Sequence, residues 1–397
     1  MGVGSSRINL STSQIADTTN LFNSHNTHTN LLSRHPFPST SSAISGLNSH
    51  MLDPQPPAFT SSATASRALN SQDLRAANEQ EYVPEILPCK NQGVMVPRTQ
   101  NIIIGMSTGA LFDLRTDHEI EQQHGAKAYS DYQIAHENEI LNKGQGFSVA
   151  DKCFKINEKL AAIGSELKFD VLVTSKNTPS SSVRIYDSAK HHGLPLRRGI
   201  FAGGEPPYGY AQNMGADLYL TLNKDDARAS ISAGLAAAQL VPSCMGNEHP
   251  EQLRIAFDAD AVLFTDESEQ ISKRDGLEAF YKNEEDKADI PINTGPLYKL
   301  LHRLSEIKNL FPLTEQPIRI AVTTARAAPA HKRLVKTLRE WGIDVDELHL
   351  LGGMSKGQVL KQFKPDIFFD DNEGNVLSGA EHVNSAHVIY GINNQSI

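Results

Sequence analysis

LRIAFDAD, residues 253–260, is a short and mostly apolar run that ends in two aspartates one residue apart. A run of this length and composition is typical of a strand that is buried on both faces of a parallel sheet. Similar runs recur after residue 100, with helical stretches such as His331–Trp341 between them. The expected strands are Asn101–Gly105, Phe169–Thr174, Gly199–Ala202, Asp217–Leu222, Leu253–Phe257, Ile318–Thr323, Glu347–Leu351 and Asp366–Phe369. This alternation predicts an α/β fold with a doubly wound, mostly parallel sheet.

Residues 101–240 and 253–390 follow the same order of predicted elements, and in both a strand ends in two glycines. We interpret them as duplicated halves, with a chance likeness between two generic α/β halves as the alternative. The first half has Asp113-Leu114-Arg115 where we place Asp258-Ala259-Asp260 in the second, and Thr221-Leu222 where the second has Asp370-Asp371. The predicted domains are therefore an α/β half without catalytic acids (96–250) and a catalytic half (251–397) with a small cap near 266–310.

Residues 1–95 are rich in Ser, Thr, Asn, His and Pro and show no apolar period, so we expect a disordered tail. Its start, MGVGSS, fits the pattern for N-myristoylation at Gly2. The Ser-rich and acid-poor composition also resembles an organelle transit peptide. An untargeted tail on a cytoplasmic protein is the third interpretation, and we prefer it.

Composition disfavours several kinds of partner and structure. The formal net charge is -9 and there is no basic run, which disfavours a nucleic-acid partner. The cysteines are few and far apart (Cys89, Cys153 and Cys244), which disfavours a disulfide framework and suits a reducing compartment. No apolar run approaches the roughly 20 residues of a transmembrane segment. The sequence does not decide between a monomer and a homo-oligomer.

Reactive side chains follow the predicted strands of the second half, at the edge where open α/β sheets bind ligands. Two carboxylates in Asp-x-Asp can supply a nucleophile and a general acid/base. A threonine at a strand end can bind a phosphoryl oxygen beside a helix N-terminus, and a lysine can neutralise the phosphate. Paired aspartates suit Mg²⁺. These features are Asp258 and Asp260, Thr323 or Thr324, Lys356, and Asp370 with Asp371.

Each of these features also has an ordinary structural interpretation. Asp-x-Asp is often a solvated turn, and threonine is a common helix cap. Lysine is often a surface residue, and paired aspartates often occur in turns. The occurrence of all four features in order within one half is more specific for a functional site than any one of them.

The ordered set resembles that of the haloacid-dehalogenase-like phosphatases. Within that superfamily three longer segments are similar to the type I cytosolic 5′-nucleotidases, and the resemblance covers roughly residues 100–391. These segments are AFDADAVLFTDESE (256–269), KTLREWG (336–342) and IFFDD (367–371). Here Ala259 and Met354-Ser355 depart from the pattern without removing a reactive group.

The resemblance implies a role for each matching residue. Asp258 would be the nucleophile, and Asp260 the general acid/base with its backbone carbonyl on the metal. Thr324, or Thr323 in the other register, would bind the phosphoryl group, and Lys356 would stabilise the transition state. Asp370 and Asp371 would serve a Mg²⁺ site together with Asp258 and Asp260, and either of the two could be the direct ligand.

The expected reaction is Mg²⁺-dependent hydrolysis of a nucleoside 5′-monophosphate, with AMP favoured, through an aspartyl-phosphate. The expected partner is therefore a small nucleotide. One alternative is a phosphatase or phosphotransferase that acts on another small phosphate monoester. A second alternative is a non-catalytic nucleotide-binding protein.

Overall fold

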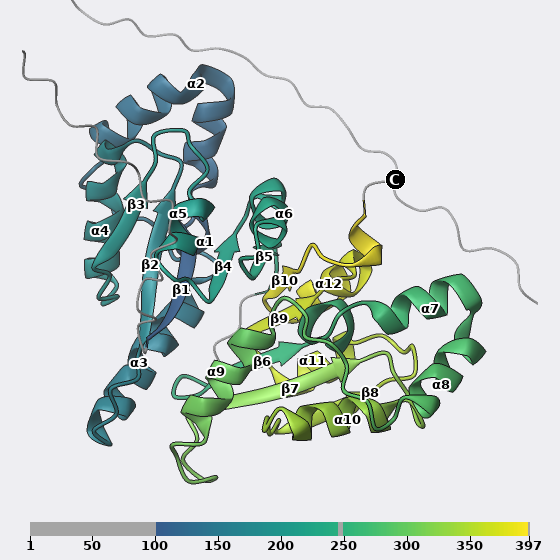
Figure 1. Cartoon of the computed structure of the whole chain (residues 1–397). Helices are drawn as coiled ribbons and strands as arrows, with labels where there is room; N and C mark the ends of the chain where they lie inside the picture. The colour runs from purple at the N-terminus through teal and green to yellow at the C-terminus, as the bar shows by residue number, and fades with distance from the viewer. Residues whose placement is uncertain (1–100, 245–248, 396–397) are drawn as a thin grey trace, which may run out of the picture. The chain divides into compact units, whose positions relative to one another are not determined.

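The computed structural model describes residues 101–244 and 249–395, in which ten strands form one sheet (Figure 1). Along the sheet the strand order is β3-β2-β1-β4-β5-β10-β9-β6-β7-β8. The strands are β1 (Ile102–Ser107), β2 (Phe169–Ser175), β3 (Arg198–Phe201), β4 (Leu218–Thr221), β5 (Ala237–Leu240), β6 (Leu253–Phe257), β7 (Ile318–Thr324), β8 (Glu347–Leu350), β9 (Ile367–Asp370) and β10 (Ser385–His387). The expected tail, with Gly2, lies outside the described residues.

Helices connect the strands, and none in the described ranges is long and apolar enough to cross a membrane. They are α1 (Thr108–Leu111), α2 (Arg115–Ala135), α3 (Phe147–Ala162), α4 (Ser182–His191), α5 (Tyr208–Asn213), α6 (Lys224–Ser232), α7 (Glu267–Asp275), α8 (Leu277–Asp286), α9 (Tyr298–Lys308), α10 (His331–Glu340), α11 (Gly357–Phe363) and α12 (Glu373–Ala380). Short helical turns are η1 (Pro179–Ser181), η2 (Ala259–Leu263) and η3 (Ile392–Asn394).

The prediction of a doubly wound and mostly parallel sheet is confirmed. Every paired strand runs parallel to its neighbour except β5 and β10, which are antiparallel where the two halves of the sheet join. Each expected strand is present, with ends shifted by at most two residues. The sequence analysis missed β5 and β10, the short strands that join the halves.

The halves repeat one strand order, because β3-β2-β1-β4-β5 corresponds to β8-β7-β6-β9-β10. Since β5 and β10 are antiparallel, the strands of the two halves run in opposite directions. The carboxyl ends of the strands, where ligands bind in such sheets, therefore lie at opposite edges of the sheet in the two halves.

Strand register corrects one alignment in the sequence analysis. Ile102 pairs with Phe169 as Leu253 pairs with Ile318. Counting along β1 and β6 from these pairs places Ser107 at the position of Asp258. The placement of Asp113 opposite Asp258 was therefore wrong. The other pairing agrees with the register, since Thr221 ends β4 as Asp370 ends β9.

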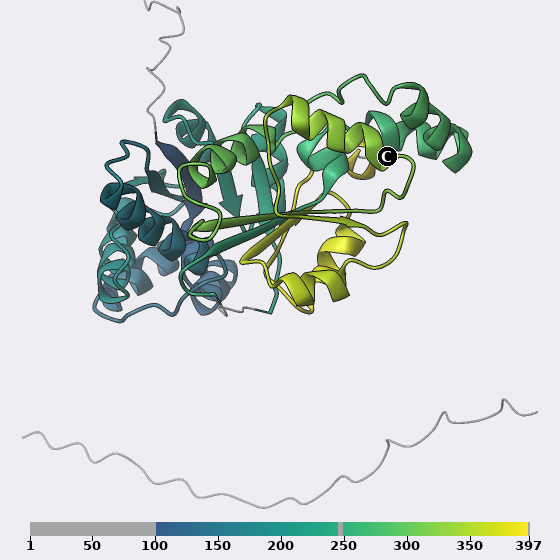
Figure 2. The same cartoon turned by 90° about the horizontal axis from the view of Figure 1, so that it is seen from below.

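Helices cover both faces of the sheet, as the view from below shows (Figure 2). On one face α3, α4, α9 and α10 share a single apolar core that extends across both halves. The other face carries smaller apolar clusters, one with α5 in the first half and one with α11 in the second. The strands inside the sheet are thus buried on both faces, as their composition predicts, whereas the edge strands β3 and β8 are partly exposed.

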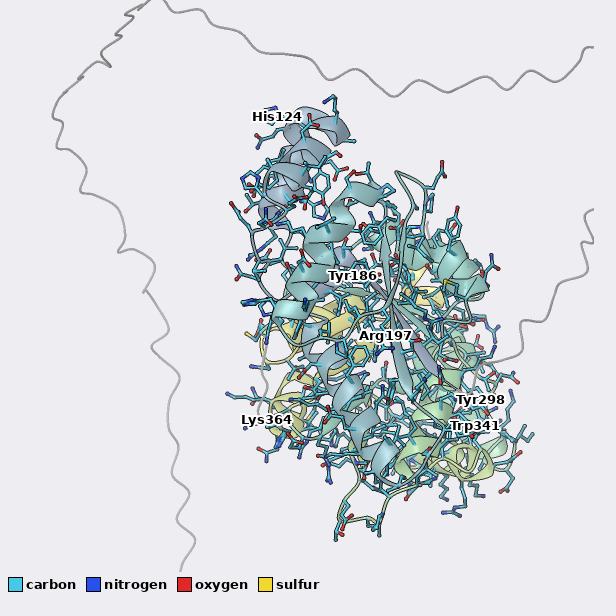
Figure 3. The ribbon with its side chains drawn as sticks, turned by 90° about the vertical axis from the view of Figure 1, so that its left-hand side faces the viewer. His124, Tyr186, Arg197, Tyr298, Trp341 and Lys364 are labelled. Atoms are coloured by element: carbon cyan, nitrogen blue, oxygen red, sulfur yellow. The ribbon has the colours of Figure 1, made fainter. Side chains whose placement is uncertain are left out.

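Aromatic side chains hold α9 and α10 together on the shared core. Trp341, at the end of α10, packs edge-on against Tyr298 of α9, with 4.6 Å between the ring centroids. Figure 3 shows the two side chains next to each other. The ring of Phe264 packs against the same indole, with 5.1 Å between the ring centroids. The start of the cap segment is therefore fixed to the core of the second half.

A buried ion pair links the halves. Lys152 on α3 donates to Asp366, just before β9, at 2.5 Å, and both side chains are 3% exposed. The second carboxylate oxygen of Asp366 accepts from the backbone N–H of Arg254 at 2.8 Å. Each charge is therefore paired in a region that excludes water.

We predict that Lys152→Met destabilises the protein by about 3–5 kcal/mol, because it leaves the Asp366 carboxylate buried without its cation. Urea unfolding followed by circular dichroism measures this. The control is Lys155→Met on the same helix, which removes a half-exposed pair with Asp151 and should cost about 0–1 kcal/mol. Equal losses for the two variants would contradict the prediction.

Candidate active site

A cavity of about 250 Å³ lies at the carboxyl ends of β6, β7 and β9 in the second half. We call it the Asp258 pocket. Its lining contains the predicted residues Asp258, Asp260, Thr324 and Asp371. The remaining lining residues are Glu269, Ser272, Leu277, Phe280, Tyr281, Ala325, Arg326, Asn372, Asn375 and Asn393.

Asp258 is the first residue after β6, and the backbone fixes its position. Its N–H donates to the carbonyl of Phe369 on the neighbouring strand at 2.8 Å. Its carboxylate accepts from the N–H of Ala259 at 2.7 Å. The chain then turns tightly, with Ala261 at a positive φ of 57°, which returns it toward the core after Asp260.

Lys356 lies between two of the predicted acids. Its ammonium is 2.8 Å from Asp258 and 2.6 Å from Asp370, and its side chain is 2% exposed. Burial by itself would lower the pKa of Lys356, but the charges of Asp258 and Asp370 raise it above its usual value. The turn before Lys356 contains Gly352 and Gly353 at positive φ, a conformation that glycine adopts without a steric cost.

Three carboxylates gather in a group that could hold a metal ion. Asp258, Asp370 and Asp371 each offer an oxygen, and these oxygens lie within 4.8 Å of one another. Burial, together with the neighbouring carboxylates, raises the pKa of Asp258 to about 7 and that of Asp371 to about 9. Hard carboxylate oxygens under mutual repulsion are a suitable donor set for Mg²⁺.

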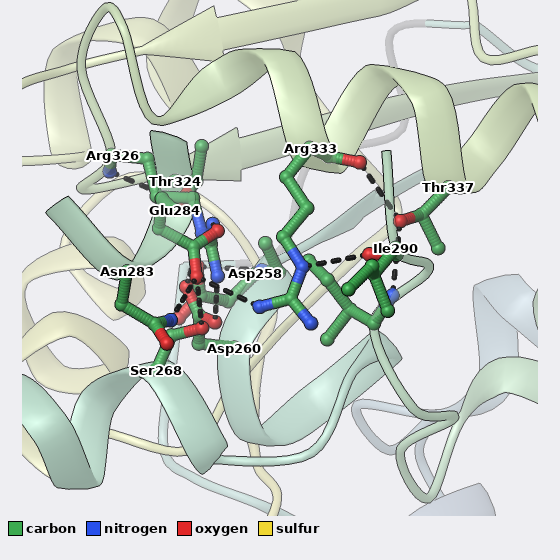
Figure 4. A network of polar contacts seen from close by, with 12 residues as sticks. Asp258, Asp260, Ser268, Asn283, Glu284, Ile290, Thr324, Arg326, Arg333 and Thr337 are labelled. Carbon is green, nitrogen blue, oxygen red and sulfur yellow. Dashed lines mark hydrogen bonds and ion pairs between the residues drawn. The ribbon is translucent and has the colours of Figure 1, made fainter. Parts of the chain in front are cut away.

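Asp260 lies in the same pocket, and its carboxylate is held by an arginine. Arg326 donates to both carboxylate oxygens of Asp260, at 2.8 and 2.6 Å. Arg326 also donates to Glu284 on α8, which pairs with Arg333 of α10 at 3.0 Å. Figure 4 shows this network, which joins Asp260 to α8 and α10.

Opposite charges compensate one another in this network. Burial opposes the ionisation of Glu284, but the charge of Arg326 and the bonds that Glu284 accepts lower its pKa below the usual value. Ser268 of α7 adds a hydrogen bond to Glu284 at 2.7 Å. The network therefore fixes both α7 and α8 relative to the pocket.

Geometry distinguishes the two candidate threonines. Thr324 lines the Asp258 pocket, and its hydroxyl accepts from the N–H of Arg326 at 3.1 Å. The Thr323 hydroxyl instead contacts His349 on β8 at 2.9 Å and does not line this pocket. Of the two candidates, Thr324 is therefore the threonine at the Asp258 pocket.

The expected cap segment 266–310 contributes to the site unequally. Helices α7 and α8 supply Glu269, Ser272, Leu277, Phe280 and Tyr281 to the pocket lining. Helix α9 instead buries its apolar face in the core. The elements over the pocket are therefore α7 and α8.

Sequence reasoning gave no role to Arg326, Glu284 or Asn393. Arg326 follows Thr324 by two residues in the same loop, and this closeness to a predicted site residue could have identified it as a further site residue. Asn393 donates to Asp371 at 2.7 Å, although the two residues are 22 positions apart in the sequence. Glu284 is one of several acids on α8, and nothing local distinguishes it from its neighbours.

Comparison with known proteins identifies the family of this chain. A family model described as 5′-nucleotidase matches residues 94–395. The chain belongs to the 5′-nucleotidase family. Human cytosolic 5′-nucleotidase 1B is 33% identical over 306 residues, which cover 75% of this chain and 50% of that protein. The chain thus spans about half the length of this curated relative.

We predict that Mg²⁺ raises the melting temperature of the wild-type protein, because it offsets the repulsion among Asp258, Asp370 and Asp371. At a hundred times its Kd a ligand stabilises a protein by about 2.7 kcal/mol. Asp371→Asn should be more stable than wild type in EDTA and should gain less from Mg²⁺. Differential scanning fluorimetry measures both effects.

The control for this experiment is Asp289→Asn, which changes an acid that is 85% exposed and paired only with the surface residue Lys336 among the described residues. It should respond to Mg²⁺ as wild type does. A full Mg²⁺ response in Asp371→Asn would show that the ion binds elsewhere.

Proposed function

We propose that this protein hydrolyses nucleoside 5′-monophosphates, with AMP favoured, to a nucleoside and inorganic phosphate. The observation that carries the proposal is the buried Asp258 carboxylate, which contacts Lys356 and lies within one acidic group with Asp370 and Asp371. Membership of the 5′-nucleotidase family supports it. The name of the human relative supports a cytosolic location.

In this proposal Asp258 attacks the phosphorus of the substrate, and the bond from phosphorus to the nucleoside oxygen breaks. The product of this step is an aspartyl-phosphate on Asp258. Asp260 gives its proton to the departing nucleoside oxygen. It then takes a proton from the water that attacks phosphorus and releases phosphate.

Positive charge must offset the anionic phosphoryl group as the anionic carboxylate approaches it. Lys356 supplies part of that charge, since its ammonium already contacts the attacking carboxylate. A bound Mg²⁺ would supply the rest at Asp258, Asp370 and Asp371, with the backbone carbonyl of Asp260 as a further ligand. The Thr324 hydroxyl would hold a phosphoryl oxygen at the end of β7.

Arg326 must release Asp260 before Asp260 can act as a general acid. Both oxygens of Asp260 are engaged by the guanidinium in this structure. Asp260 can carry a proton toward the leaving group only after one of these contacts opens. An anionic phosphate that enters the pocket competes for Arg326 and so releases Asp260.

The part of the pocket under α8 suits a nucleoside leaving group. Leu277, Phe280 and Tyr281 line it and offer apolar and aromatic surface. A base can stack on such surface without a specific hydrogen-bond pattern. Hydrolysis of a small phosphate monoester without a base is the second candidate, and the family membership disfavours it.

We predict that Asp258→Asn abolishes phosphate release from AMP and that Asp260→Asn lowers kcat by about a hundred- to ten-thousand-fold. A phosphate-release assay over several nucleoside monophosphates and one sugar phosphate, with and without Mg²⁺, measures this. Equal rates on the nucleotides and the sugar phosphate would favour the second candidate.

The control variant is Asp113→Asn in the first half, whose carboxylate pairs with the exposed side chain of Arg115. It should keep near wild-type turnover. Activity that survives in folded Asp258→Asn would refute the proposed nucleophile.

A further inference from the structure

The first half contains a cavity at the position that corresponds to the Asp258 pocket. Strand register places Ser107 at the position of Asp258, Ser175 at that of Thr324, and Thr221 at that of Asp370. These three hydroxyl residues line a cavity of about 440 Å³. We call it the first-half pocket. It lies at the carboxyl ends of β1, β2 and β4.

Backbone geometry around the two pockets is also alike. Gly203 and Gly204 follow β3 with φ of 59° and 104°, and Gly352 and Gly353 follow β8 with φ of 56° and 86°. Asn223 caps α6 by accepting from the N–H three residues ahead, and Asn372 does the same for α12. The backbone that forms the catalytic pocket is therefore repeated around the first-half pocket.

The side chains of the first-half pocket differ from those of the Asp258 pocket in charge. Hydroxyls replace Asp258 and Asp370, Leu222 takes the position of Asp371, and Gly109 in the loop after β1 takes the position of Asp260. The pocket also has a cation, Lys176, which pairs with Asp226 at 2.7 Å and is 41% exposed. The lining also contains Glu121 and His118, whose side chains contact each other at 3.4 Å.

Two hydroxyls among the lining residues lack a partner. The oxygens of Thr174 and Tyr219 are buried, and neither makes a hydrogen bond within the described ranges. Tyr219 lies close enough to Thr174 and Thr221 for both to influence its pKa, but these contacts do not have hydrogen-bond geometry. A buried polar group without a partner is costly, and a polar ligand is one way to satisfy it.

We infer that the first-half pocket binds a phosphorylated ligand, a nucleoside phosphate or inorganic phosphate, without a divalent metal and without cleaving it. Three buried carboxylates repel a phosphate in the Asp258 pocket unless a cation is present, and this pocket has hydroxyls or an apolar side chain in their place. The hydroxyls of Ser107, Ser175 and Thr221 can donate to phosphate oxygens, and Lys176 can turn from Asp226 to the anion. Ser107 takes the position of the proposed nucleophile Asp258, so the pocket lacks the carboxylate that would form an aspartyl-phosphate.

The test uses the full chain carrying Asp258→Asn in EDTA, so that AMP is not consumed and no metal supports the Asp258 pocket. Isothermal titration calorimetry with AMP and, separately, with inorganic phosphate should show binding at one site per chain. Binding of AMP without binding of inorganic phosphate would identify a nucleotide site. Binding of both ligands would identify a site that recognises the phosphate group. Absence of binding by either ligand would overturn the inference.

Matched variants locate the binding site. In the same background Ser175→Ala or Lys176→Met should weaken binding by about tenfold, the effect of losing one charge-assisted hydrogen bond. Thr324→Ala, the corresponding change in the second half, should leave the affinity unchanged. Lys176 is partly exposed, so its variant tests the inference even if Ser175→Ala folds poorly. Loss of binding in Thr324→Ala, with no loss in the other two, would place the ligand in the Asp258 pocket and overturn the inference.

Discussion

Concentrated negative charge at the carboxyl ends of β6 and β9 is the constraint on which the second half of the sheet depends. Asp258, Asp370 and Asp371 are buried together, and their oxygens lie within 4.8 Å of one another. Lys356 contacts two of these acids, and Asn393 donates to the third. Like charges held this close in a buried group favour a cation and an anionic ligand that arrives with it. The same arrangement that makes the pocket costly to fold makes it suited to phosphoryl chemistry.

Opposed orientation of the two halves explains how one chain holds two related pockets that do not merge. Because β5 and β10 are antiparallel, the strand ends of the first half lie at the opposite edge of the sheet from those of the second. The first half therefore lines no part of the Asp258 pocket among the described residues. Its link to the Asp258 pocket is through the shared core and the Lys152–Asp366 pair, which stabilise the half that carries the acids.

Local pattern was enough to predict most of the sheet, because a buried parallel strand must be apolar along its whole length. It missed β10, whose three residues, Ser385–His387, do not form such a run. It also paired Asp113 with Asp258, because Leu111-Phe112-Asp113 resembles Ala256-Phe257-Asp258, and only strand register shows that Ser107 holds that position. For the site, the sequence order of the acids, Thr324 and Lys356 was sufficient to bring them to one region. The contact between Arg326 and Glu284 joins positions 42 residues apart, and no local spacing predicts it.

The central claim is that Asp258 carries the phosphoryl group between the two steps of the reaction. Rapid mixing of the enzyme with Mg²⁺ and AMP labelled in its phosphate, followed by acid quenching and peptide mapping, tests it directly. The account predicts early label on the peptide that contains Asp258, with nucleoside released before phosphate. Simultaneous release of nucleoside and phosphate, with no label on the protein at any time, would contradict it.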